Sequence, residues 1–245
     1  MSRRLPWLEP GDPLPPIDQA LREPNGLLAA GRDLSAARLL EAYRSGIFPW
    51  YVPSQPVLWW SPDPRMVLYL DEFRPSSSLL KLARKVAREG LWSIRFNTAF
   101  DTVMQACAQP RPGQDATWIT AEIRAAYGDL HSMGHAHCIE VWRPAGDGSS
   151  EALIGGLYGV SMGRMFFGES MFTRERDASK LALLYLVNLL RQLDFRVIDC
   201  QQNTRHLASL GAREIPRSRF ITQLSELAQL PDPDWSSVRI EVSGA

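Results

Sequence analysis

The chain contains 245 residues, of which 45% are apolar, and this length suits a small domain followed by a larger one. Its 27 basic residues balance its 27 acidic ones, which excludes a general nucleic-acid binder coated in positive charge but permits a local basic strip. No apolar run approaches the roughly 20 residues that span a bilayer, and the first residues lack the apolar stretch of a signal peptide. Cys107, Cys138 and Cys200 form no CxxC pair, which is typical of reduced thiols. We therefore expect a cytoplasmic protein without a membrane segment.

Pro and Gly dominate the first part of the chain, so residues 1–34 predict extended structure with turns. Ser35 is a favourable N-cap for an amphipathic helix, and Gly46 is suited to the position just after the end of that helix. Residues 57–60 then predict a strand, because four apolar residues precede a cluster of turn-forming ones.

A Pro-rich corner at residues 61–64 is the predicted domain boundary. It separates a small N-terminal α/β domain, residues 1–64, from a larger domain, residues 65–245. The predicted strands of the larger domain cover 66–70, 94–96, 138–142, 153–160, 165–167, 195–199 and 238–242, and the predicted helices cover 79–88, 99–108, 121–132, 178–193 and 204–210. We expect Ser78, Thr120 and Asp177 to start three of these helices.

This order of elements predicts an α+β fold with a mixed sheet. The strand–helix–strand run that ends at residues 203–212 is similar to the C-terminal half of the GNAT acyltransferase fold. A fold alone does not give a function, so the function has to come from particular residues.

Eight short motifs resemble signatures of the leucyl/phenylalanyl-tRNA–protein transferase family. They are EPNGLLA (23–29), GIFPW (46–50), LWWSPDPR (58–65), TWI (117–119), GGLYGV (155–160), FGESMF (167–172), DASK (177–180) and IDCQ (198–201). Their common order makes the resemblance specific over roughly residues 20–220. The chain departs from the family pattern at Arg32, Ala36, Ser77 and Leu80, where the family usually has Gly, Pro and two basic residues.

The resemblance implies an enzyme that needs neither metal nor coenzyme. Such an enzyme takes Leu, Phe or, less well, Met from aminoacyl-tRNA and links it to a protein that begins with Arg or Lys. The new N-terminus marks that protein for degradation. The expected partners are therefore aminoacyl-tRNA and proteins with N-terminal Arg or Lys, and we expect the enzyme to be a monomer.

The reaction is attack of an α-amine on an ester carbonyl, and an α-amine with a pKa of about 7.7–8.0 needs no strong base. The resemblance assigns a proton relay to Asp199 and Gln201, whose side chains share one side of the chain if it stays extended. Glu169 is expected to bind or orient the cationic substrate terminus. Two alternatives remain open: Asp199 caps the next helix, and Glu169 pairs with Arg174.

The other candidate residues fall into three groups. By the resemblance, the aminoacyl side-chain pocket is formed by Leu157, Phe166, Leu186 and Ile198, although each is also an ordinary core position. Base–aromatic stacking predicts that Trp50 and Trp118 hold the 3′-terminal adenosine, with domain-interface packing as the alternative. A basic helix face could grip tRNA phosphates or simply be solvated; it consists of Lys81, Arg84, Lys85 and Arg88.

Three other chemistries are disfavoured. His131, His135, His137 and Cys138 imitate a zinc cluster by spacing, but Gly134 should end the helix between them, so we expect no metal. The chain has no glycine-rich pyrophosphate loop for acetyl-CoA, and Ser170 has no evident His base for an acyl-enzyme. Two rival functions are a tRNA-dependent transferase acting on a cell-wall precursor or small amine, and a non-catalytic adaptor that binds protein N-termini.

Overall fold

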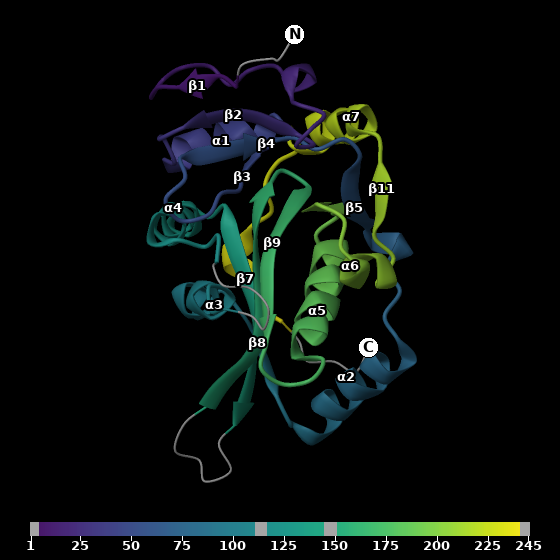
Figure 1. Cartoon of the computed structure of the whole chain (residues 1–245). Helices are drawn as coiled ribbons and strands as arrows, with labels where there is room; N and C mark the ends of the chain where they lie inside the picture. Colours follow the sequence, from purple (N-terminus) through teal and green to yellow (C-terminus); the bar gives the residue numbers. More distant parts are fainter. Residues whose placement is uncertain (1–4, 111–116, 145–150, 241–245) are drawn as a thin grey trace.

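The computed structural model describes residues 5–110, 117–144 and 151–240. Its helices and strands are β1 (Trp7–Leu8), β2 (Leu27–Gly31), α1 (Ala36–Arg44), β3 (Phe48–Pro49), β4 (Val57–Trp60), β5 (Arg65–Tyr69), α2 (Ser77–Glu89), β6 (Ser93–Phe96), α3 (Phe100–Cys107), α4 (Ala121–Ser132), β7 (Ala136–Pro144), β8 (Glu151–Met162), β9 (Met165–Thr173), α5 (Ala178–Gln192), β10 (Val197–Gln201), α6 (Arg205–Ser209), β11 (Arg213–Ile215) and α7 (Arg217–Leu227). Short 3₁₀-helices occupy Ile17–Gln19, Leu70–Glu72 and Trp235–Ser237. Two sheets combine with these helices, which confirms the predicted α+β class (Figure 1).

The smaller sheet lies in the N-terminal part of the chain and has the strand order β1-β2-β4-β3. Helix α1 packs beside it and starts as predicted, because the Ser35 hydroxyl accepts a hydrogen bond from the Arg38 backbone N–H. Gly46 follows the helix with a φ of +71°, a conformation that glycine adopts without a steric penalty. The division into domains at residue 64 stays a prediction.

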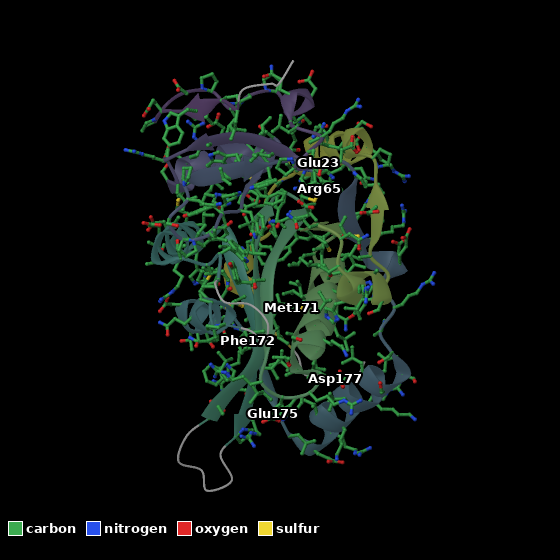
Figure 2. All side chains as sticks on the ribbon, viewed as in Figure 1. Glu23, Arg65, Met171, Phe172, Glu175 and Asp177 are labelled. Atoms are coloured by element: carbon green, nitrogen blue, oxygen red, sulfur yellow. The ribbon has the colours of Figure 1, made fainter. Side chains whose placement is uncertain are left out.

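The larger sheet has seven strands in the order β11-β5-β10-β9-β8-β7-β6. Strands β7, β8 and β9 form an antiparallel meander, and α5 then crosses over so that β10 pairs parallel with β9. Figure 1 shows α3 and α4 on one face of this sheet and α5 on the other. Figure 2 follows the chain through Met171, Phe172, Glu175 and Asp177, from β9 into α5. The parallel β9–α5–β10 unit is the strand–helix–strand run predicted from the sequence.

Side chains that alternate along the strands of the large sheet pack into two hydrophobic clusters, one on each face of the sheet. Val67 and Phe167 join the cluster that also contains α1, α3, α4 and the smaller sheet. Leu68 and Phe166, their neighbours in sequence, join the cluster built around α5 and α2. Helix α5 is buried nearly all round, which is consistent with its largely apolar sequence.

Several local predictions need correction. Helix α2 starts two residues earlier than the predicted helix 79–88, because Ser76 rather than Ser78 caps it. Asp177 makes no capping hydrogen bond: its φ is +66°, and its carboxylate instead binds the ammonium group of Lys180 at 2.7 Å.

Three errors concern the C-terminal part. Strand β11 and helix α7, which follows Pro216, were not predicted. The expected strand at 238–242 is wrong for residues 238–240, which are not in a strand, while 241–242 lie outside the described residues. Across the described part of the chain, no helix combines the length and the hydrophobicity needed to cross a membrane.

Candidate active site

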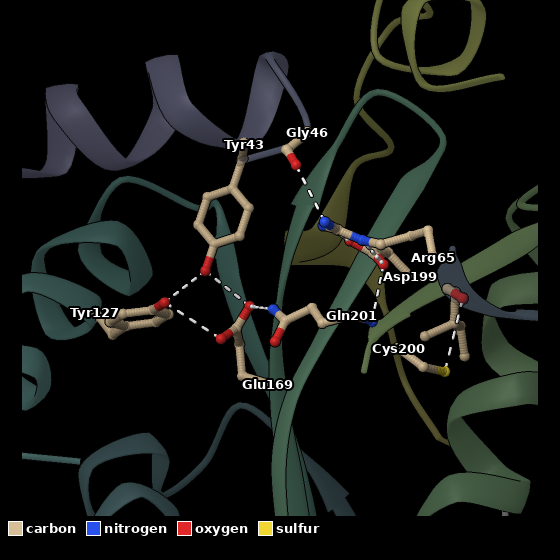
Figure 3. A network of polar contacts seen from close by, with 9 residues as sticks. Tyr43, Gly46, Arg65, Tyr127, Glu169, Asp199, Cys200 and Gln201 are labelled. Atoms are coloured by element: carbon tan, nitrogen blue, oxygen red, sulfur yellow. Dashed lines mark hydrogen bonds and ion pairs between the residues drawn. The ribbon is translucent and has the colours of Figure 1, made fainter. Parts of the chain in front are cut away.

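A buried ion pair forms the foundation of the site. The guanidinium of Arg65, the first residue of β5, binds the Asp199 carboxylate with two hydrogen bonds, Nε to Oδ1 at 2.8 Å and Nη2 to Oδ2 at 2.7 Å (Figure 3). Both side chains have 0% exposure. Burial of two charges is costly, but this paired fork geometry satisfies both carboxylate oxygens. Asp199 is therefore committed to Arg65.

Three further contacts hold the Arg65 guanidinium. Its Nη1 donates to the Gly46 carbonyl at 3.1 Å, at the end of α1. The rings of Phe48 and Phe220 lie 4.8 and 4.6 Å from its central carbon, which gives it two cation–π contacts. Arg65 thus connects the N-terminal sheet, α7 and the strand that carries Asp199.

Gln201 leaves the regular strand geometry that the relay prediction assumed. The pairing of β10 with β5 shifts register between Asp199 and Gln201, and Gln201 has a φ of +62°. As a result its backbone N–H, not its side chain, donates to Asp199 Oδ1 at 2.9 Å. The Gln201 side-chain amide turns the other way and donates to Glu169 Oε1 at 2.9 Å. The expectation that the two side chains share one side of the chain is wrong, because the bulge rotates the Gln201 side chain away from Asp199.

Glu169 is the extra residue of a second irregularity, in β9. Its neighbours Gly168 and Ser170 pair with the consecutive residues Gly159 and Tyr158 of β8, so Glu169 has no partner in the ladder. Such bulges commonly re-aim a side chain near an active site. The Glu169 carboxylate accepts a hydrogen bond from the Gln201 amide, and the hydroxyls of Tyr43 and Tyr127 lie within hydrogen-bonding distance of it, at 2.7 and 3.2 Å (Figure 3).

Glu169 titrates in an unusual range. Burial raises the pKa of its carboxyl to about 7, and the charge of nearby Asp199 acts in the same direction. Burial also raises the pKa values of Tyr43 and Tyr127 well above the ordinary tyrosine value. Near neutral pH the tyrosines therefore keep their protons while Glu169 changes its charge, which is a property of groups that transfer protons.

A cavity of about 500 Å³ opens beside this network. All four residues predicted to form the aminoacyl pocket line it, namely Leu157, Phe166, Leu186 and Ile198. Glu169 and Gln201 line it as well, whereas Asp199 is absent from its lining. Glu169 is the only Asp or Glu among the described lining residues, so an acidic pair of Glu169 and Asp199 does not face the cavity.

The two tryptophans predicted to bind adenosine also line the cavity. Trp50 is 39% exposed, and its ring meets the Trp60 ring edge-on at a centroid distance of 5.6 Å. The Trp60 Nε1–H donates to the Trp50 carbonyl at 2.6 Å, which anchors the neighbouring backbone. Trp118 is partly buried and stands just before α4. An accessible aromatic surface therefore borders the cavity.

The basic face of α2 lies apart from the cavity, because no residue of α2 contributes to the described lining. Lys81, Arg84, Lys85 and Arg88 are all exposed. Lys85 and Arg88 form ion pairs with Glu89 at 3.8 and 2.6 Å. The proposed contact of this basic face with tRNA phosphates stays a prediction.

Both alternatives for the acidic residues are wrong. Thr204, not Asp199, caps α6 by accepting a hydrogen bond from the Leu207 N–H. Arg174 donates to the Leu153 carbonyl and does not pair with Glu169.

The His cluster has packing roles. His131 stacks on Phe100 at 4.2 Å between ring centroids, and His137 lies 4.1 Å from the Trp235 ring. Within the described ranges, no group of three His, Cys, Asp or Glu side chains is arranged to hold a metal ion.

Three residues of the network were missed from the sequence: Arg65, Tyr43 and Tyr127. Arg65 stood at the end of the LWWSPDPR motif and Tyr43 on the apolar face of a predicted helix, but neither position signals a polar partner far along the chain. Arg65 and Asp199 are 134 positions apart, and Tyr43 and Glu169 are 126 apart. Only the folded sheet brings them together.

Comparisons with known proteins identify the family of this chain. Residues 67–225 match the family model for leucyl/phenylalanyl-tRNA protein transferase, and residues 32–63 match the model for its N-terminal domain. The chain is 54% identical over 247 residues to the leucyl/phenylalanyl-tRNA–protein transferase of Bordetella petrii, with 99% of this chain and 95% of the relative covered. It is also 54% identical to the protein of that name from Chromobacterium violaceum, over 94% of each chain.

Among solved structures, FemX matches with a TM-score of 0.44 at 10% identity, covering 77% of this chain and 70% of the other. L-PGS from Bacillus licheniformis matches with a TM-score of 0.39 at 9% identity, covering 74% and 57%. The sequence matches are far stronger and span nearly the whole chain. The chain therefore belongs to the leucyl/phenylalanyl-tRNA–protein transferase family.

Proposed function

We propose that this chain transfers leucine or phenylalanine, and methionine less well, from aminoacyl-tRNA to the N-terminal Arg or Lys of acceptor proteins. The product is a new peptide bond that marks the acceptor for degradation. The observation that carries the proposal is one cavity whose apolar wall meets the polar pair Glu169 and Gln201 and is bordered by Trp50 and Trp118.

The apolar wall fits the side chain of the transferred amino acid. Leu157, Phe166, Leu186 and Ile198 offer hydrocarbon surface and no charge. An apolar pocket discriminates one methylene by only about 1–3 kcal/mol, so Leu, Phe and Met are expected to share it. Trp50 and Trp118 would stack on the terminal adenosine, where each base–aromatic contact contributes about 1–3 kcal/mol without reading sequence.

The polar side of the cavity fits the reacting amine. Glu169 supplies negative charge for an N-terminal Arg or Lys, and the Gln201 carboxamide oxygen can accept a hydrogen bond from the attacking amine. Asp199 acts indirectly. It accepts a hydrogen bond from the Gln201 backbone N–H in the bulge and is itself bound by Arg65. We therefore propose Glu169 and Gln201 as the catalytic residues and Asp199 as a positioning residue.

The setting follows from the substrates. Aminoacyl-tRNA is a cytoplasmic substrate, so we propose that the enzyme acts in the cytoplasm as a monomer. Its formal net charge is zero, and contact with tRNA would therefore be local, at the cavity and on the basic face of α2.

The test of acceptor specificity is a transfer assay with radiolabelled leucyl-tRNA and three otherwise identical proteins that begin with Arg, Lys or Ala. We expect label on the first two acceptors and none on the third. Equal labelling of all three, or labelling of a cell-wall precursor or small amine instead, would favour the rival transferase.

The adaptor rival is tested with Gln201→Asn. Asn tolerates the left-handed conformation of Gln201, but its shorter side chain withdraws the amide from Glu169. We expect aminoacyl-tRNA binding to persist and transfer to fall at least tenfold. Gln192→Ala, at the exposed end of α5, is the control that removes an amide elsewhere. If the protein were an adaptor, the unmodified chain would bind protein N-termini and would transfer no amino acid to them.

A further inference from the structure

Three oxygen–oxygen contacts behind the cavity wall form a closed triangle. The Tyr43 hydroxyl lies 2.7 Å from Glu169 Oε1, the Tyr127 hydroxyl lies 3.2 Å from Glu169 Oε2, and the two hydroxyls are 2.5 Å apart (Figure 3). Each contact joins two different groups, so the triangle can hold three hydrogen bonds.

When Glu169 is ionised, the triangle contains one proton fewer than it has contacts. Each phenol carries one proton and the carboxylate carries none, so two protons must serve three contacts. Two hydroxyl oxygens at 2.5 Å need a proton between them. Tyr127 therefore donates to Tyr43, and Tyr43 donates to Glu169, which leaves the longest contact, 3.2 Å, without a proton.

A single added proton completes the triangle. The Gln201 amide and Tyr43 both donate to Glu169 Oε1, so Oε2 is the oxygen that is available to hold a proton. From Oε2 that proton points at the Tyr127 oxygen. Each of the three groups then donates one hydrogen bond and accepts one within the ring.

The surrounding titratable groups leave Glu169 as the member that changes its charge. Burial raises the pKa values of Tyr43, Tyr127 and the neighbouring Tyr158, so all three stay protonated when the Glu169 carboxyl, with a pKa of about 7, titrates. The remaining charged neighbour, Asp199, is paired with Arg65, and its negative charge raises the pKa of Glu169.

We propose that Glu169, Tyr43 and Tyr127 form a proton-accepting ring that takes up the proton released by the attacking amine. This inference rests on the transfer reaction proposed above. As the amine nitrogen bonds to the ester carbonyl carbon, one of its protons passes to Glu169 Oε2 and closes the ring. When the bond from that carbon to the tRNA ribose oxygen breaks, the proton returns to the leaving oxygen, so Glu169 ends as a carboxylate. Tyr43 and Tyr127 are positioning residues in this scheme.

The sign of one pKa change tests the ring. If both phenols simply donated to the carboxylate, removing either hydroxyl would raise the pKa of Glu169. In the ring the protonated form uses one more hydrogen bond than the ionised form, so Tyr127→Phe strands the Oε2 proton and lowers that pKa by about half to one unit. Tyr43→Phe breaks the same ring and shifts the pKa in the same direction.

The first measurement is a titration of the Glu169 carboxyl carbon by ¹³C NMR in substrate-free protein, with the resonance assigned by its loss in Glu169→Gln. The control is Tyr185→Phe, because the buried Tyr185 hydroxyl makes no hydrogen bond to the residues that the structure describes. We expect a midpoint near 7 in the unmodified and control proteins and a lower midpoint in Tyr127→Phe. A raised or unchanged midpoint in Tyr127→Phe would overturn the ring.

The second measurement is the pH dependence of kcat/KM for leucyl transfer. In Tyr127→Phe, the part of the pH profile that reports ionisation of Glu169 should move to lower pH by the same amount as the NMR midpoint. The part that reports ionisation of the acceptor α-amine should not move. A limb that does not follow the midpoint would remove Glu169 from proton transfer. If the unmodified protein transfers nothing, the proposed function fails, and the NMR titration still tests the ring by itself.

Discussion

Replacing Asp199 with alanine would expose the thermodynamic cost of the buried ion pair. The change leaves the Arg65 guanidinium at 0% exposure with the Gly46 carbonyl and two aromatic rings, but without a counter-charge. Breaking a buried pair by removing one partner costs about 3–5 kcal/mol. For a chain of this size each kcal/mol lowers Tm by about 2–4 °C, so we expect a decrease of roughly 6–20 °C.

The assay is urea unfolding and thermal melting followed by circular dichroism, with Asp101→Ala as the control. Asp101 pairs with Arg124 at 2.7 Å, but its side chain is 68% exposed, so its loss should cost less than about 1 kcal/mol. A loss in Asp199→Ala no larger than in Asp101→Ala would refute the assignment of Asp199 to a structural pair. Loss of transfer in Asp199→Ala would therefore not by itself show direct catalysis, which is why Gln201→Asn is the better probe.

Three further predictions address the donor, the tRNA and the carboxyl group. Trp118→Ala should raise KM for aminoacyl-tRNA by about 5- to 100-fold with a smaller change in kcat, because it removes one stacking contact; an unchanged KM would exclude stacking on Trp118. If α2 grips phosphates, changing Lys85 and Arg88 to Gln should reduce the slope of log KM against log salt by about two, and an unchanged slope would leave α2 as a solvated face. The folded-state pKa of Glu169, about 7, exceeds its ordinary value of 4.5, so its ionisation removes stability as pH rises through that window. The stability of the unmodified protein relative to Glu169→Gln, measured by urea unfolding, should therefore fall between pH 4 and pH 8, and a constant difference would contradict the raised pKa.

Local structure could be predicted from the sequence wherever it depends on residues that are close together in the chain. Ser35 and Thr120 cap helices as expected, because each hydroxyl accepts from a backbone N–H three residues later. Asp177 failed the same expectation because the turn from β9 holds it at a positive φ and turns its carboxylate toward Lys180.

The identities of two active-site residues could be predicted from the sequence, but their orientations could not. Glu169 and Gln201 stood in recognisable motifs, but their orientations depend on bulges in β9 and β10 that form through pairing with β8 and β5. Gly168, next to Glu169, is the kind of strand glycine that accompanies bulges, but the sequence does not specify where either bulge falls. The sequence therefore supported a list of reacting groups, while the direction of every hydrogen bond between them came from the sheet.

The position predicted as a domain boundary is also where the site is held together. Arg65 begins the large sheet, yet the Gly46 carbonyl and the Phe48 ring contact it from the N-terminal side, and Phe220 contacts it from α7. A larger residue at Gly46 would be strained by the φ of +71°, and its Cβ would lie 3.1 Å from the Phe220 ring and 2.5 Å from the end of the Ile221 side chain. The same N-terminal segment supplies Tyr43 to Glu169. Because one arginine links these surfaces to Asp199, the first 64 residues act on the reacting groups through direct contacts, and changes in α1 should alter the chemistry as well as the stability of the fold.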